Sequence, residues 1–239
     1  KYFGKLLTSP LLNTPDMIGW GVIGPCQGGI VDNREFTNTI DTYTTAVTGI
    51  AFIEAGREWQ REDYLAVGYR AAKCLVDYIG WREFDDGIGF HPNETKPDRG
   101  MVVLNRSSLA DACLIEACES CRVSAHDRDR YFSLARGCTS LLLSTALVKS
   151  RLPYCLGRGH ENDLSHELLI GEALLAIYDR WSIRGISEHI TRMLDQIEAQ
   201  ISPEGAFLEL DQPVTFDSPQ AIAFLARCIL HRFEEKRCT

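Results

Sequence analysis

The 239-residue chain has few basic residues, no long apolar run and none of the common catalytic signatures. It carries 25 Lys and Arg against 33 Asp and Glu, a net charge of −8, which disfavours binding to nucleic-acid phosphates. No stretch approaches the roughly 18 uninterrupted apolar residues that a membrane-spanning helix needs. We therefore expect neither a nucleic-acid partner nor a membrane partner.

The sequence also lacks a phosphate-binding loop, a dinucleotide-binding fingerprint, a GxSxG nucleophile elbow and an HExxH motif. Its nine cysteines, an odd number scattered through apolar stretches, are typical of buried free thiols in a reducing compartment. This favours a cytoplasmic protein and leaves secretion and one or two disulfides open. Cys118 and Cys121 form a CxxC inside a predicted helix, without the second pair that a zinc knuckle needs, so we expect core packing there.

Residues 1–36 are rich in Gly, Pro, Asn and Thr and are predicted to form an irregular N-terminal arm that carries Trp20. Over 37–239 the apolar residues recur with the helical period of 3.6. This pattern predicts an all-α fold with seven helices, at 38–57, 62–80, 107–123, 127–148, 164–181, 186–201 and 218–233.

The predicted helices pair into hairpins that repeat. In the first helix of each pair a small residue precedes two large apolar ones, as in Ala51-Phe52-Ile53, Cys113-Leu114-Ile115, Ala173-Leu174-Leu175 and Ala223-Phe224-Leu225. The second helices begin near acidic residues followed by Tyr64-Leu65 or Tyr131-Phe132, and glycine-containing returns such as 86–90 follow. First helices are apolar almost all round and second helices carry more charge, which favours a toroid with the first helices inside over a linear solenoid.

This repeat resembles the α/α-toroid superfamily, which includes the six-hairpin glycosidases and sugar epimerases, over roughly residues 37–232. Polysaccharide lyases and terpenoid cyclases share related toroidal forms. The resemblance is architectural and implies a partial or complete (α/α) toroid with a site in its central funnel. Because the chain has fewer hairpins than these enzymes, we expect a homo-oligomer or a further domain to complete the ring.

The mouth of such a funnel is built by the N-terminal ends of the first helices, whose amides favour negative charge. Together with the dense polar segment 154–167, these ends supply most of the candidates. Asp111 is added as an expected buried, hydrogen-bonded carboxylate on an otherwise apolar inner face, and Trp20 and Trp81 are added as aromatic residues available for sugar stacking. The candidate catalytic residues are Asp41, Tyr43, Asp111, His160, Glu161, His166, Glu167 and Asp217. The candidate substrate-binding residues are Trp20, Trp81, Asn105, Arg106 and Arg158.

Their residue types fit two kinds of chemistry. Glycoside hydrolysis needs two carboxyl groups, whereas a lyase or an epimerase uses a His or Tyr beside an Arg that holds an acid group. Cys155, His160 and His166 offer metal-ligand types, and Tyr-Cys-Leu-Gly faintly resembles a motif of lanthionine cyclases. The later Cys-His pair of that family is missing, so we expect no metal and no cofactor.

Three functions follow. The first is a carbohydrate-active enzyme (glycoside hydrolase, polysaccharide lyase or sugar epimerase) acting on a glycan or another small molecule. The second is a terpenoid or other small-molecule cyclase or isomerase, and the third is a non-catalytic interaction or accessory domain. Structural roles compete with these: Ser, Thr or Arg neighbours can satisfy Asp41, Asp111 and Glu116, and residues 91–93 are expected in a surface loop or rim lid.

Overall fold

The computed structural model describes residues 9–21, 39–94, 101–120, 123–148, 152–156, 164–181, 183–199, 208–209 and 212–213. Its helices are α2 (Thr42–Glu58), α3 (Glu62–Cys74), α4 (Leu104–Ser120), α5 (Ala125–Val148), α6 (Leu164–Trp181) and α7 (Arg184–Ala199), and a π-helix, η2 (Leu75–Ile79), extends α3. The first six predicted helices are thereby confirmed, and the seventh, 218–233, lies outside the described residues. None of the described helices is both long and apolar enough to cross a membrane.

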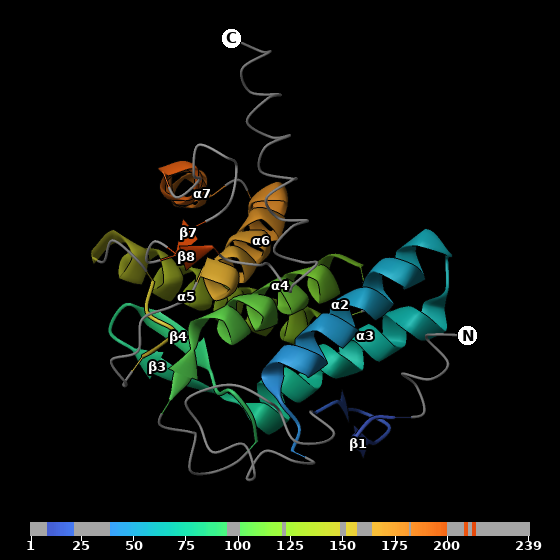
Figure 1. Cartoon of the computed structure of the whole chain (residues 1–239). Helices are drawn as coiled ribbons and strands as arrows, with labels where there is room; N and C mark the ends of the chain where they lie inside the picture. The colour runs from blue at the N-terminus through green and yellow to red at the C-terminus, as the bar shows by residue number, and fades with distance from the viewer. Residues whose placement is uncertain are drawn as a thin grey trace.

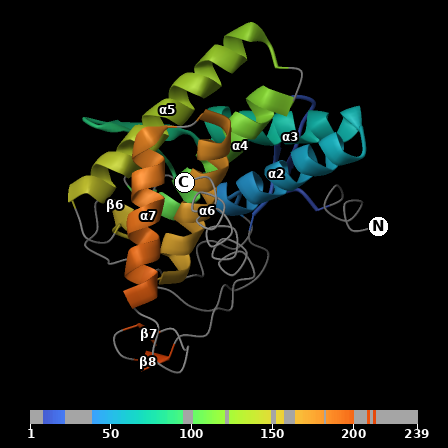
Figure 2. The same cartoon turned by 90° about the horizontal axis from the view of Figure 1, so that it is seen from above.

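The helices form two layers (Figures 1 and 2). In one layer α4 packs between α2 and α6, and α3, α5 and α7 each cover the helix that precedes them in the chain. The layers differ in burial, because 14 of the 17 residues of α4 are buried but only five of the 13 residues of α3. The predicted arrangement of first helices inside and second helices outside is confirmed, and the described hairpins form a partial (α/α) toroid.

Short antiparallel strand pairs connect the hairpins. They are β1 (Leu12–Asn13) with β2 (Ile18–Gly19), β3 (Trp81–Phe84) with β4 (Gly87–Phe90), β5 (Val102–Val103) with β6 (Cys155–Leu156), and β7 (Leu208–Glu209) with β8 (Gln212–Pro213). The glycine-containing return predicted at 86–90 is part of the β3–β4 hairpin. Gly87 makes it possible: its φ is 152°, and a Cβ there would lie 2.1 Å from the Gly137 carbonyl oxygen of α5.

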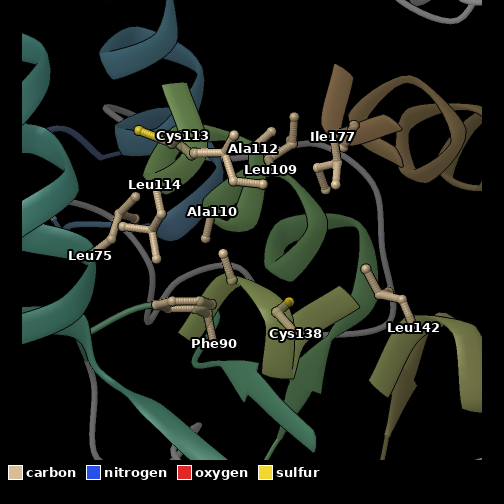
Figure 3. Close-up of a cluster of buried hydrophobic side chains, with 14 of the residues drawn as sticks. Leu75, Phe90, Leu109, Ala110, Ala112, Cys113, Leu114, Cys138, Leu142 and Ile177 are labelled. Atoms are coloured by element: carbon tan, nitrogen blue, oxygen red, sulfur yellow. The ribbon is translucent and has the colours of Figure 1, made fainter. Parts of the chain in front are cut away.

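Close helix contacts depend on small residues, as the repeat predicts. A Cβ on Gly68 of α3 would lie 2.2 Å from Cγ1 of Ile53 on α2, so a larger residue would push these helices apart. Around α4 the core gathers Leu75 from η2, Phe90 from β4, and side chains of α5 and α6 (Figure 3). The five described cysteines, Cys74, Cys113, Cys118, Cys138 and Cys155, are buried and outside disulfides, as predicted.

Trp20, in the described part of the N-terminal arm, lies in the core. Its side chain is 3% exposed and stacks on Phe52 with the ring centroids 6.0 Å apart. Its backbone N–H donates to the Thr45 hydroxyl, and its carbonyl accepts from that hydroxyl and from the Asp41 amide. This burial argues against the expected role of Trp20 in sugar stacking, because a stacking platform must reach solvent.

Leu114 tests the central position of α4. Its side chain is fully buried in the main core, so Leu114→Ala should lower the free energy of unfolding by about 2–5 kcal/mol in urea titrations. Leu11→Ala, at a side chain that is 37% exposed, is the matched control and should change it by less than about 1 kcal/mol. Equal losses for the two variants would contradict a core centred on α4.

Candidate functional site

Asp41 begins α2 as its N-cap. Its Oδ1 accepts from the Thr44 amide at 2.8 Å and its Oδ2 accepts from the Thr44 hydroxyl at 2.7 Å. The residue is 4% exposed and has the extended backbone typical of a cap. The structural interpretation of Asp41 is therefore confirmed, and both carboxylate oxygens hold the start of α2.

The segment His91-Pro92-Asn93, which we call the strap, joins the starts of α2 and α4. The Pro92 carbonyl accepts from the Thr42 amide and from the Arg106 guanidinium, each at 3.0 Å. Two further backbone contacts hold the strap in place. The His91 amide donates to the Gly80 carbonyl, and Asn93 forms a β-bridge with Asp41. The expectation of a surface loop at 91–93 is wrong: His91 is 8% and Asn93 0% exposed.

A second connection joins the starts of α4 and α6. The β5–β6 pair places Tyr154 so that its carbonyl accepts from the Leu104 amide, the first of α4, at 3.1 Å. The Tyr154 ring meets the His166 ring edge-on with centroids 4.9 Å apart. Glu167 is 4% exposed, and its Oε1 accepts from the Leu152 amide at 3.3 Å.

The three inner helices thus begin at one end of the molecule. Six of the predicted site residues lie in their caps or first turns: Asp41, Tyr43, Asn105, Arg106, His166 and Glu167. Tyr43, Arg106 and His166 are partly exposed, whereas the side chains of the other three are buried. The Asn105 Oδ1 is buried and accepts no hydrogen bond in the described part of the chain.

Asp111 lies away from this end. It is seven residues, about two helical turns, beyond the start of α4, and its Oδ2 accepts from the Thr139 hydroxyl of α5 at 2.7 Å. Complete burial raises the pKa of its carboxyl well above the usual value. The neighbouring Cys138 thiol, also buried, has a raised pKa because of its burial and the nearby Asp111. Asp111 is therefore a buried, hydrogen-bonded carboxyl group between the inner and outer layers, as its place in an apolar helix predicts, and its raised pKa favours the protonated form.

The remaining candidates divide into two groups. Trp81 begins β3 opposite Phe90, is partly buried and packs against the main core. It stands next to Gly80, which binds the strap. Arg158, His160, Glu161 and Asp217 lie outside the described residues.

Among the described residues, this end combines first-turn amides with the partly exposed side chains of Arg106, His166 and Tyr43. Such groups can bind an anion and move protons. Across the residues that the structure describes, no three His, Cys, Asp or Glu side chains are placed to hold a metal ion. The sequence offered the strap only as a surface loop or a rim lid and did not predict its burial; its local signal is the His-Pro-Asn that directly follows an apolar segment.

No protein-family model matches the chain, and no curated protein matches it. Solved structures do. A glycosyl hydrolase family 88 protein from Bacteroides vulgatus has a TM-score of 0.59 and 9% sequence identity, over 81% of this chain and 62% of that one. A possible member of the GH105 family from Salmonella enterica has a TM-score of 0.62 and 14% sequence identity, over 86% of this chain and 60% of that one. The cellobiose 2-epimerase of Spirochaeta thermophila has a TM-score of 0.62 and 16% sequence identity, over 89% of this chain and 55% of that one.

These similarities establish the fold. The chain has the α/α-toroid architecture of glycosidase-like enzymes, as its repeat predicts, and it spans between 55% and 62% of the lengths of these three structures. The neighbours are carbohydrate-active hydrolases and epimerases, with a polysaccharide lyase among them. They give no support to the cyclase alternative.

The protonated state of Asp111 predicts a pH dependence of stability. The folded protein keeps this proton where the unfolded chain releases it, so the carboxyl lowers stability increasingly as the pH rises above about 4. Asp111→Asn removes the effect. The free energy of unfolding of the variant minus that of the wild type should increase from pH 4 to pH 7, by at most about 1.4 kcal/mol per pH unit.

Urea titrations at several pH values measure this difference. Asp63→Asn is the control, because Asp63 is an exposed carboxylate whose pKa is lowered by a hydrogen bond from Arg61, and its replacement should give no such increase. A constant difference between Asp111→Asn and the wild type over this range would show that Asp111 ionises as readily in the folded protein as in the unfolded chain.

Proposed function

We propose that the protein is a carbohydrate-active enzyme that binds an acidic glycan at the starts of α2, α4 and α6. The observation that carries the proposal is the shared Pro92 carbonyl, which places the Arg106 guanidinium beside the first turn of α2. The α/α-toroid fold and the carbohydrate-active neighbours support the substrate class.

Arg106 is the proposed recognition group for a sugar carboxylate. Its side chain is partly exposed, and its Nη1 is held by Pro92, which leaves further N–H donors of the planar fork for a ligand. Arginine binds carboxylates through two parallel hydrogen bonds, and the neighbouring helix starts add positive potential. Asn105, beside Arg106, stays a candidate substrate contact from the sequence; its Oδ1 is buried and accepts no hydrogen bond in the described part of the chain.

His166 is the proposed proton-transfer group. The carboxylates of Asp41 and Glu167 are committed to backbone hydrogen bonds, so a two-carboxylate hydrolysis would have to break contacts that hold the helix starts. Imidazole exchanges protons near neutral pH, and the edge of Tyr154 fixes the orientation of the ring. This favours a lyase or an epimerase, with proton transfer next to a carboxylate, over a hydrolase.

Other predicted roles belong to the same proposal. Tyr43 is a candidate second proton donor or sugar contact, and Trp81 a candidate stacking residue. Arg158, His160, Glu161 and Asp217, outside the described residues, stay candidates from the sequence. A homo-oligomer or a further domain that completes the ring is also proposed, because the chain is shorter than the matched structures.

Binding of uronic-acid oligosaccharides tests the recognition step. In titration calorimetry, Arg106→Ala should weaken binding of these oligosaccharides about 10- to 100-fold. Arg106→Lys should weaken it less, because lysine keeps the positive charge and loses only the planar fork of N–H donors. Arg128→Ala, at an exposed arginine of α5, is the matched control and should bind like the wild type. If the wild type binds acidic and neutral oligosaccharides equally or not at all, the proposal is wrong.

The reaction is tested separately on the oligosaccharides that bind. An unsaturated product, a new reducing end or an inverted sugar carbon, followed by absorbance and NMR, identifies a lyase, a hydrolase or an epimerase. His166→Asn should lower turnover about 100-fold or more and leave binding within twofold, whereas His126→Asn at an exposed histidine should change neither. Binding without any turnover would support the accessory-domain alternative.

A further inference from the structure

Tyr78 is an exposed aromatic residue that a π-turn presents at the same end of the molecule as the proposed site. The turn is closed by the Gly80 amide, which donates to the Leu75 carbonyl at 3.0 Å. Leu75, Val76 and Ile79 are buried, but Tyr78 is 39% exposed. Such π-turns occur at helix C-termini, and the left-handed Gly80 (φ 82°) ends the helix here, directly after Tyr78 and Ile79.

The Tyr78 hydroxyl is tied to the start of α2 through Glu94. It donates to the Glu94 carboxylate, and this bond, burial and the nearby negative charge raise the pKa of the hydroxyl, so it stays protonated at neutral pH. Glu94 is itself fixed to Ile40 twice: its Oε1 accepts from the Ile40 amide at 3.1 Å, and its amide donates to the Ile40 carbonyl at 3.2 Å. Ile40 directly precedes the cap residue Asp41, and Glu94 directly follows the strap.

We propose that Tyr78 forms an outer subsite, where its ring stacks against a sugar unit of a glycan chain that extends from the proposed site. The inference rests on the proposed function for the class of ligand. A Tyr ring offers a flat apolar face, and its hydroxyl is already held, so little rotamer entropy is lost when a sugar binds. The outer position predicts a contribution to long oligosaccharides only.

Length-dependent binding tests the subsite. For uronic-acid oligosaccharides of increasing length, Tyr78→Ala should raise the dissociation constant about five- to tenfold for the longer chains and leave that of the monomer unchanged. Tyr78→Phe keeps the ring and loses the bond to Glu94, so it should raise the constant for long chains by about twofold or less. Circular dichroism and thermal unfolding verify that both variants are folded.

Trp59→Ala is the matched control. Trp59 is 55% exposed but caps the opposite end of α2, so its loss should leave binding of every length unchanged. Wild-type binding that does not strengthen with chain length, equal binding by Tyr78→Ala and wild type, or a loss for Trp59→Ala in place of Tyr78→Ala would each overturn the subsite. A wild type that binds no acidic oligosaccharide overturns the proposed function itself, and with it the sugar as the ligand of Tyr78.

Discussion

The carbonyl oxygen of Pro92 is the acceptor that joins the starts of α2 and α4. It accepts a hydrogen bond from a first-turn amide of α2, and such amides have no partner inside their own helix. It accepts a second hydrogen bond from the Arg106 guanidinium of α4. Each bond contributes about 0.5–3 kcal/mol, but leaving a buried partner unsatisfied costs more than forming it gains. Proline suits this position because its nitrogen has no N–H that would need an acceptor, while its carbonyl accepts two hydrogen bonds.

A consequence concerns which groups are left for chemistry. Among the described residues, the Asp41 and Glu167 carboxylates at this end accept hydrogen bonds from backbone amides, and Asp111, which bonds to Thr139 of α5, has a raised pKa because it is buried. Carboxylates that hold backbone geometry cannot exchange protons without loosening it. The partly exposed groups, Arg106 and His166, are those that can act without disturbing the helix starts, and this is why the proposal assigns binding and proton transfer to them.

The sequence predicted the helices well because their causes are local. An apolar period of 3.6 fixes a helix and its buried face, and small residues such as Gly49 and Gly68 indicate where neighbours approach. The strap could not be predicted, because His-Pro-Asn is polar and turn-like by itself and is buried only by pairing with Asp41, about 50 residues earlier. For Asp111, periodicity showed that the residue is buried, but the rotation of α4 against α5 decides which neighbour it faces.

The polar groups of α4 show how the fold separates stability from the proposed site. Ser107 bonds to the backbone of Phe90, Asp111 to Thr139, and Glu116, near the other end, to Arg57 at 2.9 Å. As predicted, Asp111 and Glu116 have Thr and Arg partners, so these groups lock α4 to β4, α5 and α2 along its length. In the first turn, the buried Asn105 Oδ1 accepts no hydrogen bond among the described residues, and Arg106 has N–H donors besides the one that Pro92 binds. The Asp111 Oδ1, two turns further along, is likewise buried without a partner. Incomplete bonding in α4 therefore favours a ligand only where the side chain is also partly exposed, as it is at Arg106.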